Sequence, residues 1–155
     1  MSVTISGTDG IDKVADGAEM PAGSVIQVVG FNTVSSWTTT SNSYSSTDLS
    51  QAITPKYANS KILVQIFGSV HFDASGTHGM GQIRKDGSTL SDYNDDDLLG
   101  YSSASFARSD MTSTFWFGDA GSTNTATYAY YVCTQNSALF YFYRNCGITI
   151  TEIKG

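Results

Sequence analysis

The stretch "ITPKYANSKILVQIFGSV", residues 53 to 70, joins a polar turn to the most regular alternating pattern in the chain. From Lys61 to Phe72, apolar residues recur at every second position, which is typical of a β-strand with two different faces. Pro55 and the polar residues 56–60 break the pattern before it begins and predict a turn. The stretch therefore predicts a long antiparallel strand whose core face carries Ile62, Val64, Ile66, Gly68, Val70 and Phe72.

The opposite face of this strand is mixed rather than polar. Leu63 and Phe67 lie there among Lys61, Gln65, Ser69 and His71. A large apolar side chain on the solvent side of a strand is a candidate for contact with another protein. We therefore take Leu63 and Phe67 as interface candidates.

The same alternation recurs along the rest of the chain, and no segment shows helical periodicity with caps. Asp86-Gly87 predicts a tight hairpin within residues 79–90, because both residues tolerate positive φ. The residues "QNSA", 135–138, predict a second hairpin between their flanking strands. Strands are expected over 24–31, 48–54, 61–72, 113–119, 126–134, 139–145 and 147–155. Short strands joined by Ser, Gly and Asn loops favour an all-β fold, and we predict an antiparallel jelly-roll-like β-sandwich over residues 21–155.

Residues 1–20 have a different pattern. Their apolar residues are separated by Gly and Asp and cannot build a core alone. Extended, they would reach roughly 60 Å. A frayed terminus is one interpretation, and an extended N-terminal arm that adds a strand to a neighbouring subunit is the other. We expect the second, which makes interface candidates of Val3, Ile5, Ile11 and Val14.

Composition excludes several classes of function. The 155 residues fit one domain, and only 14% are charged, against about 25% in typical proteins. The net charge is −6 and the basic residues are scattered, so we expect no binding to nucleic acid or to anionic membranes. No apolar run approaches the ~20 residues of a spanning helix, and "MSVTISGTDG" does not read as a signal peptide. We expect a protein made in a cytoplasm, with no membrane insertion.

Catalytic patterns are weak. His71 and His78 belong to no recognisable signature, so we expect no enzyme activity, no catalytic residues and no cofactor. Cys133 and Cys146 are not in a CxxC motif. We interpret them as two buried thiols, with a disulfide between neighbouring strands as the alternative.

One acidic cluster stands out, and it contains Asp92, Asp95, Asp96 and Asp97. Hard carboxylate oxygens suit Ca²⁺, but the spacing does not match an EF-hand loop. We interpret the cluster as a solvated loop and predict no metal, leaving these residues as weak candidates. A carboxylate pair for glycoside hydrolysis is a further alternative.

Aromatic residues make up 12% of the chain and most lie in predicted strands. In "LFYFY", residues 139–143, both faces are apolar, which predicts cover on both sides and makes Tyr141 and Tyr143 interface candidates. A symmetric neighbouring subunit would supply the second cover. Loop aromatics could instead stack on sugars, and the candidates for glycan contact are Trp37, Tyr44, Tyr93 and Tyr101.

Five blocks together resemble a known family: "PAGSVIQVV", "SYSSTDLSQAITPKYANSKILVQI", "IRKDGSTL", "TATYAYYV" and "FYRNCGITITEIKG". In this order they are similar to the C-terminal β modules of tail-fibre-like virion surface proteins, especially of marine and cyanobacterial phages. The resemblance covers residues 21–155, and "ITPKYANSKILV" is its most specific part. It implies a β-rich, usually trimeric surface module of the virion with no enzyme activity.

The expected function is therefore that of a homotrimeric bacteriophage virion structural protein, located in the virion and made in the host cytoplasm. Its place would be a tail fibre or tip, or a capsid decoration (cement) position. Partners would be copies of itself and other virion proteins, such as major capsid or tail proteins, with a host surface glycan as a further candidate. The alternative is a carbohydrate-binding host-recognition module.

Overall fold

The computed structural model describes residues 20–33, 35–72, 77–90, 97–102, 108–135, 137–142 and 145–155. For residues 72, 77–78, 97–102 and 108–112 it describes the backbone alone. The strands are β1 (Val25–Thr33), β2 (Trp37–Thr39), β3 (Ser45–Ile53), β4 (Lys61–Phe72), β5 (Thr77–Lys85), β6 (Ser88–Thr89), β7 (Asp97–Ser102), β8 (Arg108–Asp119), β9 (Ala126–Thr134), β10 (Phe140–Phe142) and β11 (Cys146–Ile153).

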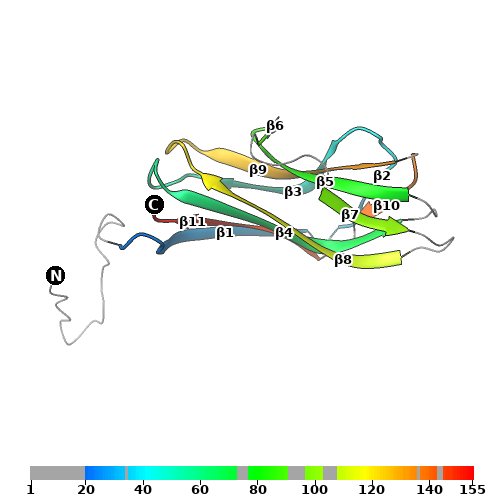
Figure 1. Cartoon of the computed structure of the whole chain (residues 1–155), viewed down its shortest axis with the longest axis horizontal. Helices are drawn as coiled ribbons and strands as arrows, with labels where there is room; N and C mark the ends of the chain where they lie inside the picture. The colour runs from blue at the N-terminus through cyan, green and yellow to red at the C-terminus, as the bar shows by residue number, and fades with distance from the viewer. Residues whose placement is uncertain are drawn as a thin grey trace, which may run out of the picture.

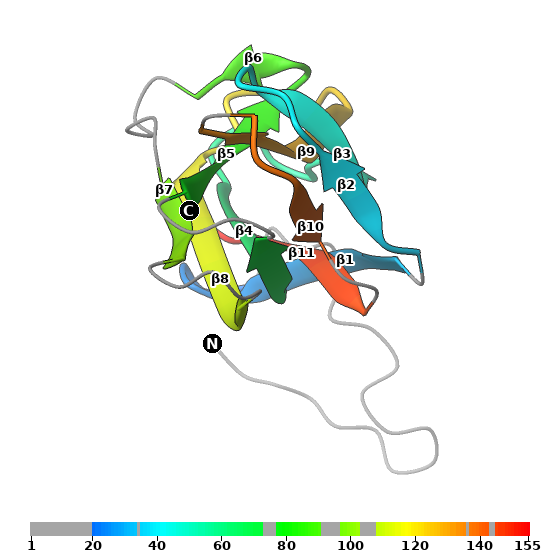
Figure 2. The same ribbon diagram turned by 90° about the vertical axis from the view of Figure 1, so that its right-hand side faces the viewer.

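The strands form two antiparallel sheets that pack face to face (Figures 1 and 2). Sheet A contains β1, β11, β4, β10 and β2 in that order, with β8 on the other side of β4. Sheet B contains β3, β9, β5 and β6, with β7 also paired to β5. Over the described ranges no helix occurs, and so none could cross a membrane. The predicted all-β sandwich is confirmed.

The pairings follow a nested pattern along the chain. β1 pairs with β11, β3 with β9, β4 with β8, and β5 with β7, each pair antiparallel. The first half of the domain thus runs antiparallel to the second half, like one long hairpin that is rolled across both sheets. Consequently β1 and β11 lie together although they come from opposite ends of the domain (Figure 1).

The central strand β4 confirms the predicted core face. Ile62, Val64, Ile66 and Val70 are at most 1% exposed, whereas Phe67, on the opposite face, is 39% exposed. Full burial of an aliphatic side chain stabilises a fold by roughly 1.5–3 kcal/mol, so this row anchors the sandwich. Facing and neighbouring strands complete the core with residues that include Leu49, Ile83, Tyr128, Tyr130, Val132, Ile148 and Ile150.

The turn before β4 is held by a buried carboxylate. Glu152 of β11 is fully buried and points toward the core side of sheet A. Its Oε1 accepts hydrogen bonds from the backbone N–H groups of Lys56 (2.8 Å) and Tyr57 (3.2 Å), and its Oε2 accepts one from Gln27 Nε2 (2.6 Å). The polar turn seen in the sequence is therefore fixed to the end of the sandwich by these bonds.

The two predicted hairpins have different outcomes. Asp86 and Gly87 connect β5 to β6 with φ of 51° and 79°, which confirms the first hairpin. The second prediction is wrong, because β9 belongs to sheet B whereas β10 belongs to sheet A. β9 pairs with β3 and β5, whereas β10 pairs with β4 and β2.

Candidate interaction surface

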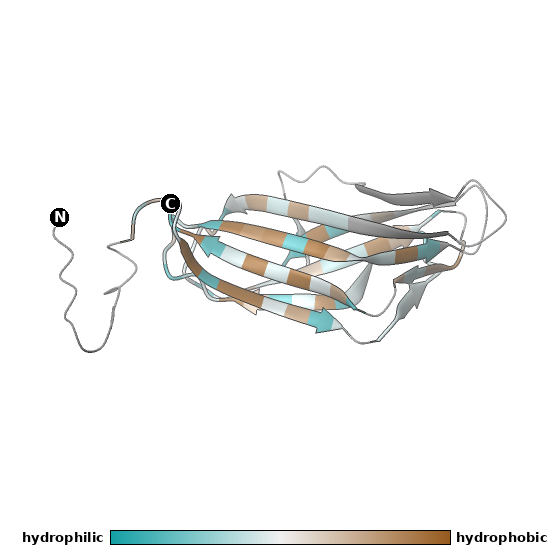
Figure 3. Cartoon of the chain, turned by 90° about the horizontal axis from the view of Figure 1, so that it is seen from below, coloured by the Kyte–Doolittle hydropathy of each residue, from teal (hydrophilic) through white to brown (hydrophobic). Residues whose placement is uncertain are grey.

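The exposed apolar side chains concentrate on one sheet. The large hydrophobic residues most exposed in the described part of the chain all belong to β1, β4 and β8 of sheet A. They are Phe115 (67% exposed), Val28 (57%), Phe117 (53%), Val25 (52%), Phe31 (42%) and Phe67 (39%). Figure 3 shows the strands of sheet A from their outer side, with each residue coloured by its hydropathy.

Strand alternation explains why the Phe115 and Phe117 rings of β8 point outward. In β8, Thr114 and Trp116 face the core, so Phe115 and Phe117 must face solvent. Register then sets their neighbours, since Phe117 lies opposite Leu63 and Phe115 lies opposite Gln65. We call the outward-facing side of β1, β11, β4 and β8 the outer A face.

The ring of Phe67 lies flat on the sheet because of a glycine. Gly147 of β11 is paired with Phe67 and is buried. A Cβ atom at this position would overlap the Phe67 ring and the Asn32 side-chain oxygen. Gly147 thus lets the ring cover the backbone of β11 rather than project from the sheet.

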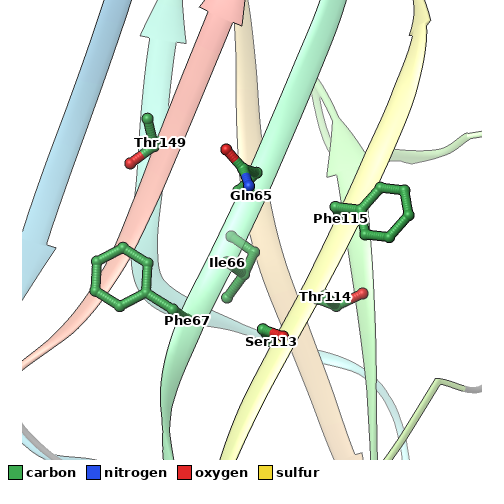
Figure 4. Close-up of a pocket in the computed structure, with 7 residues that line it drawn as sticks. All are labelled: Gln65, Ile66, Phe67, Ser113, Thr114, Phe115 and Thr149. Carbon is green, nitrogen blue, oxygen red and sulfur yellow. The ribbon is translucent and has the colours of Figure 1, made fainter.

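A depression of about 270 Å³ lies between Phe67 and Phe115 (Figure 4). The two rings lie on either side of Gln65, and hydroxyl groups from neighbouring strands complete the rim. Its lining consists of Gln65, Ile66, Phe67, Ser113, Thr114, Phe115 and Thr149. The mixture of rings, one amide and hydroxyls can accept an apolar or a neutral polar group.

Charge is nearly absent from the outer A face. Among its described residues only Lys61 and Asp119 carry a full charge, and they form an ion pair with each other at one end of the face. Covering the face would therefore bury no unpaired charge, and so the desolvation cost that opposes many interfaces is small.

The predicted interface residues are partly found on this surface. Leu63 and Phe67 both lie on the outer A face, and Leu63 is half-buried. Tyr141 is half-buried beside His71, with ring centroids 5.4 Å apart and an edge-on angle of 77°. The remaining interface candidates lie outside the described residues, and they are Val3, Ile5, Ile11, Val14 and Tyr143.

Sequence reasoning missed Phe115 and Phe117 as surface residues. "STFWFGD" contains apolar residues on both faces of a strand, the same signal that drew attention to "LFYFY". That signal indicates two covered faces but does not say which residues face the core. Val25 and Val28 were also missed, because β1 carries apolar residues on both faces and its sequence does not say which face is buried.

The glycan candidates are less exposed than loop aromatics would be. Trp37 lies in β2 and packs against the core, and Tyr44 lies with its ring 5.6 Å from the Arg84 guanidinium carbon. Tyr93 lies outside the described residues, and only the backbone of Tyr101 is described, in β7. Both described rings therefore already contact their own chain.

The structure describes little of the candidate reactive groups. Asp92, Asp95 and Asp96 lie outside the described residues, and Asp97 is described only as the first backbone position of β7. His78 is likewise described by its backbone alone. Elsewhere in the described ranges, no group of three His, Cys, Asp or Glu residues is close enough to hold a metal ion.

The two cysteines are buried and neither belongs to a disulfide, which agrees with their interpretation as buried thiols. Burial raises the pKa of the Cys146 thiol, and a backbone hydrogen bond from Ser69 opposes this rise in part. A raised pKa keeps the thiol protonated at neutral pH, and this form is a poor nucleophile.

No protein-family profile matches the sequence, and no curated protein is significantly similar to it. The resemblance to phage fibre modules therefore depends on the five sequence blocks given above.

Proposed function

We propose that the protein is a structural component of a bacteriophage virion that assembles as a homotrimer through the outer A face. In this role it acts by docking, as part of a tail fibre or tip or as a capsid decoration protein. The resemblance to tail-fibre-like modules supports the phage assignment. The single observation that carries the docking mechanism is the exposed, nearly uncharged row of phenylalanines on β4 and β8.

The size of this surface supports docking to copies of the same chain. From their exposed fractions, Phe67, Phe115 and Phe117 present roughly 300 Å² of ring surface, because an aromatic side chain has about 150–250 Å² in all. Val25 and Val28 extend the patch onto β1. Apolar patches of this size on monomers are often functional, and their polar margins allow a standard interface of about 800 Å² per partner. A face that is apolar and has its charges paired needs no oppositely charged partner, so an identical copy fits it.

The nested pairing supports the finer description of the fold as a jelly roll. A jelly roll contains eight strands in two sheets, and the eight longer strands pair as β1–β11, β3–β9, β4–β8 and β5–β7. Jelly rolls build viral capsid domains and also lectin domains. The fold is thus compatible with the proposal, while the surface is what carries it.

The test is the mass of the protein in solution, before and after the surface is changed. F115S/F117S removes two exposed rings and leaves the core unchanged, so it should fold as the wild type does. We expect its trimer to be weakened by about 100-fold or more, as is usual when central aromatic contacts are lost.

F115L/F117L is the matched control, because it keeps an apolar surface at the same positions and should retain most of the association. Sedimentation equilibrium gives the mass of each variant. A wild-type protein that stays monomeric at high micromolar concentration would contradict the proposal. To test the phage assignment, an image of the parent virion should locate this chain on the particle.

The depression beside Gln65 favours one second candidate, a neutral glycan. Stacking on Phe115 and hydrogen bonds from Gln65 and Thr149 would suit a sugar ring. A glycan array separates the two functions. A docking protein shows no glycan signal, whereas a glycan receptor shows a signal that F115S/F117S abolishes while the mass of the protein stays the same.

A further inference from the structure

Among the strands that the structure describes, β1 forms one edge of sheet A and pairs with β11 alone. In an antiparallel pair, alternate residues bond to the neighbour, so about half of the N–H and C=O groups of β1 point toward the free edge. Natural edge strands are usually protected by charged residues, proline or bulges. The sequence of β1, "VIQVVGFNT", has no charge and no proline, and its one irregularity lies near its start, between Val25 and Gln27.

The core side of the sandwich is incomplete along this edge. Phe31 pairs with Ile148, and paired residues in an antiparallel sheet share a face. Ile148 is fully buried, whereas Phe31 is 42% exposed and Val29 is half-buried. An apolar ring therefore faces the interior at the margin of the sandwich without full cover. One more strand along β1, with apolar residues on its core side, would cover it.

We propose that residues 2–6 of a neighbouring copy add to the free edge of β1, with Val3 and Ile5 packing over Phe31. The segment "SVTIS" alternates small polar and β-branched residues and has no charge, which is the pattern of a half-buried strand. It is long enough to cover the region from Val29 to Thr33.

The position of the chain's entry into the sandwich fits this arrangement. At that point Gly23 donates a backbone hydrogen bond to Lys154, beside the end of β11. Residues 7–19, when extended, would span roughly 40 Å, whereas β1 itself is about 30 Å long. The arm can thus leave its own sandwich and reach the β1 edge of a second copy. This inference rests on the proposed function, because copies must already meet through the outer A face.

Hydrogen exchange of the full-length protein tests this pairing, with the β1 amides followed by NMR. V3N/I5N removes the apolar face of the arm, and S2N/T4N is the matched control on its other face. In the wild-type oligomer we expect the free-edge amides of β1 to exchange about 100-fold more slowly than in V3N/I5N, because hydrogen bonding protects them. The amides bonded to β11 should be unchanged, and S2N/T4N should behave as the wild type.

Equal exchange of the free-edge amides in the wild type and V3N/I5N would overturn the inference while leaving an intact oligomer and the proposed function in place. Protection that persists after dilution to monomer would also overturn it, since the arm would then cover its own β1. A wild type that is monomeric at all concentrations overturns both proposals.

Discussion

Glu152 is a buried carboxylate with no cationic partner within salt-bridge distance in the described chain, and replacing it tests how the turn before β4 is held. E152A leaves the backbone N–H groups of Lys56 and Tyr57 without their acceptor, while Gln27 keeps its bond to the Thr54 carbonyl at 2.8 Å. Leaving a buried donor unpaired costs about 1–3 kcal/mol, and these two donors are partly buried, so we expect E152A to lower the free energy of unfolding by about 2–4 kcal/mol. That is a large part of a typical stability of about 5–15 kcal/mol.

E152Q is the matched variant. Its side-chain oxygen can still accept both backbone bonds. Its NH₂ group, however, would face the NH₂ group of Gln27, whose Nε2 lies 2.6 Å from Glu152 Oε2 in the wild type. We therefore expect a smaller loss of about 1–2 kcal/mol. Urea unfolding followed by circular dichroism measures both values. A loss below about 1 kcal/mol for E152A, or a larger loss for E152Q than for E152A, would refute the reasoning that these bonds hold the turn.

Two further predictions concern the core and the outer A face. Burial and the nearby Asp86 charge raise the pKa of Tyr128 to about 12, above the ~10 of an unfolded chain. Stability from this group is complete below pH ~10 and falls between pH ~10 and ~12, so Y128F should flatten the decline of unfolding free energy in alkaline titrations. G147A should cost about 1–3 kcal/mol, because its methyl group overlaps the Phe67 ring. In the double variant G147A/F67A, loss of the ring should relieve part of that cost, while the overlap with the Asn32 side-chain oxygen remains. Additive losses in the double-mutant cycle would contradict the proposed overlap with the Phe67 ring.

Local alternation predicted the strands that follow it most regularly. Residues 61–72 and 126–134 correspond to β4 and β9 at both ends. The first alternates regularly, and the second is a run of mostly aromatic, β-branched and small apolar residues. β2 and β7 were missed since β2 has three residues and β7, "DLLGYS", places two leucines side by side. The pattern was readable only where a strand is long and has one consistently apolar face.

Which strands pair with each other could not be predicted from the sequence. The residues after β9 look like a hairpin loop, yet β9 and β10 lie in different sheets. Pairing depends on contacts between distant segments, such as β4 with β8, which local patterns do not encode.

The identity of the outward face in β8 was equally hidden. Trp116 pairs with Val64, whose side chain is in the core row, and this register turns Phe115 and Phe117 to solvent. Leu63 and Phe67 could be found because β4 had one clearly stronger face. The β4 residues of the candidate surface could thus be predicted from the sequence, whereas the β8 residues depend on the register between the two strands.

The nested pairing of the strands also limits how the chain can fold during translation. Among the described strands of sheet A, β1 pairs with β11 alone, so it has no partner there until β11 has left the ribosome. At a translation rate of about 5–20 residues per second, the apolar strand β1 stays unpaired in sheet A for many seconds. We therefore expect the protein to depend on chaperones during synthesis in cells. We also expect ribosome-stalled fragments that lack β11 to aggregate.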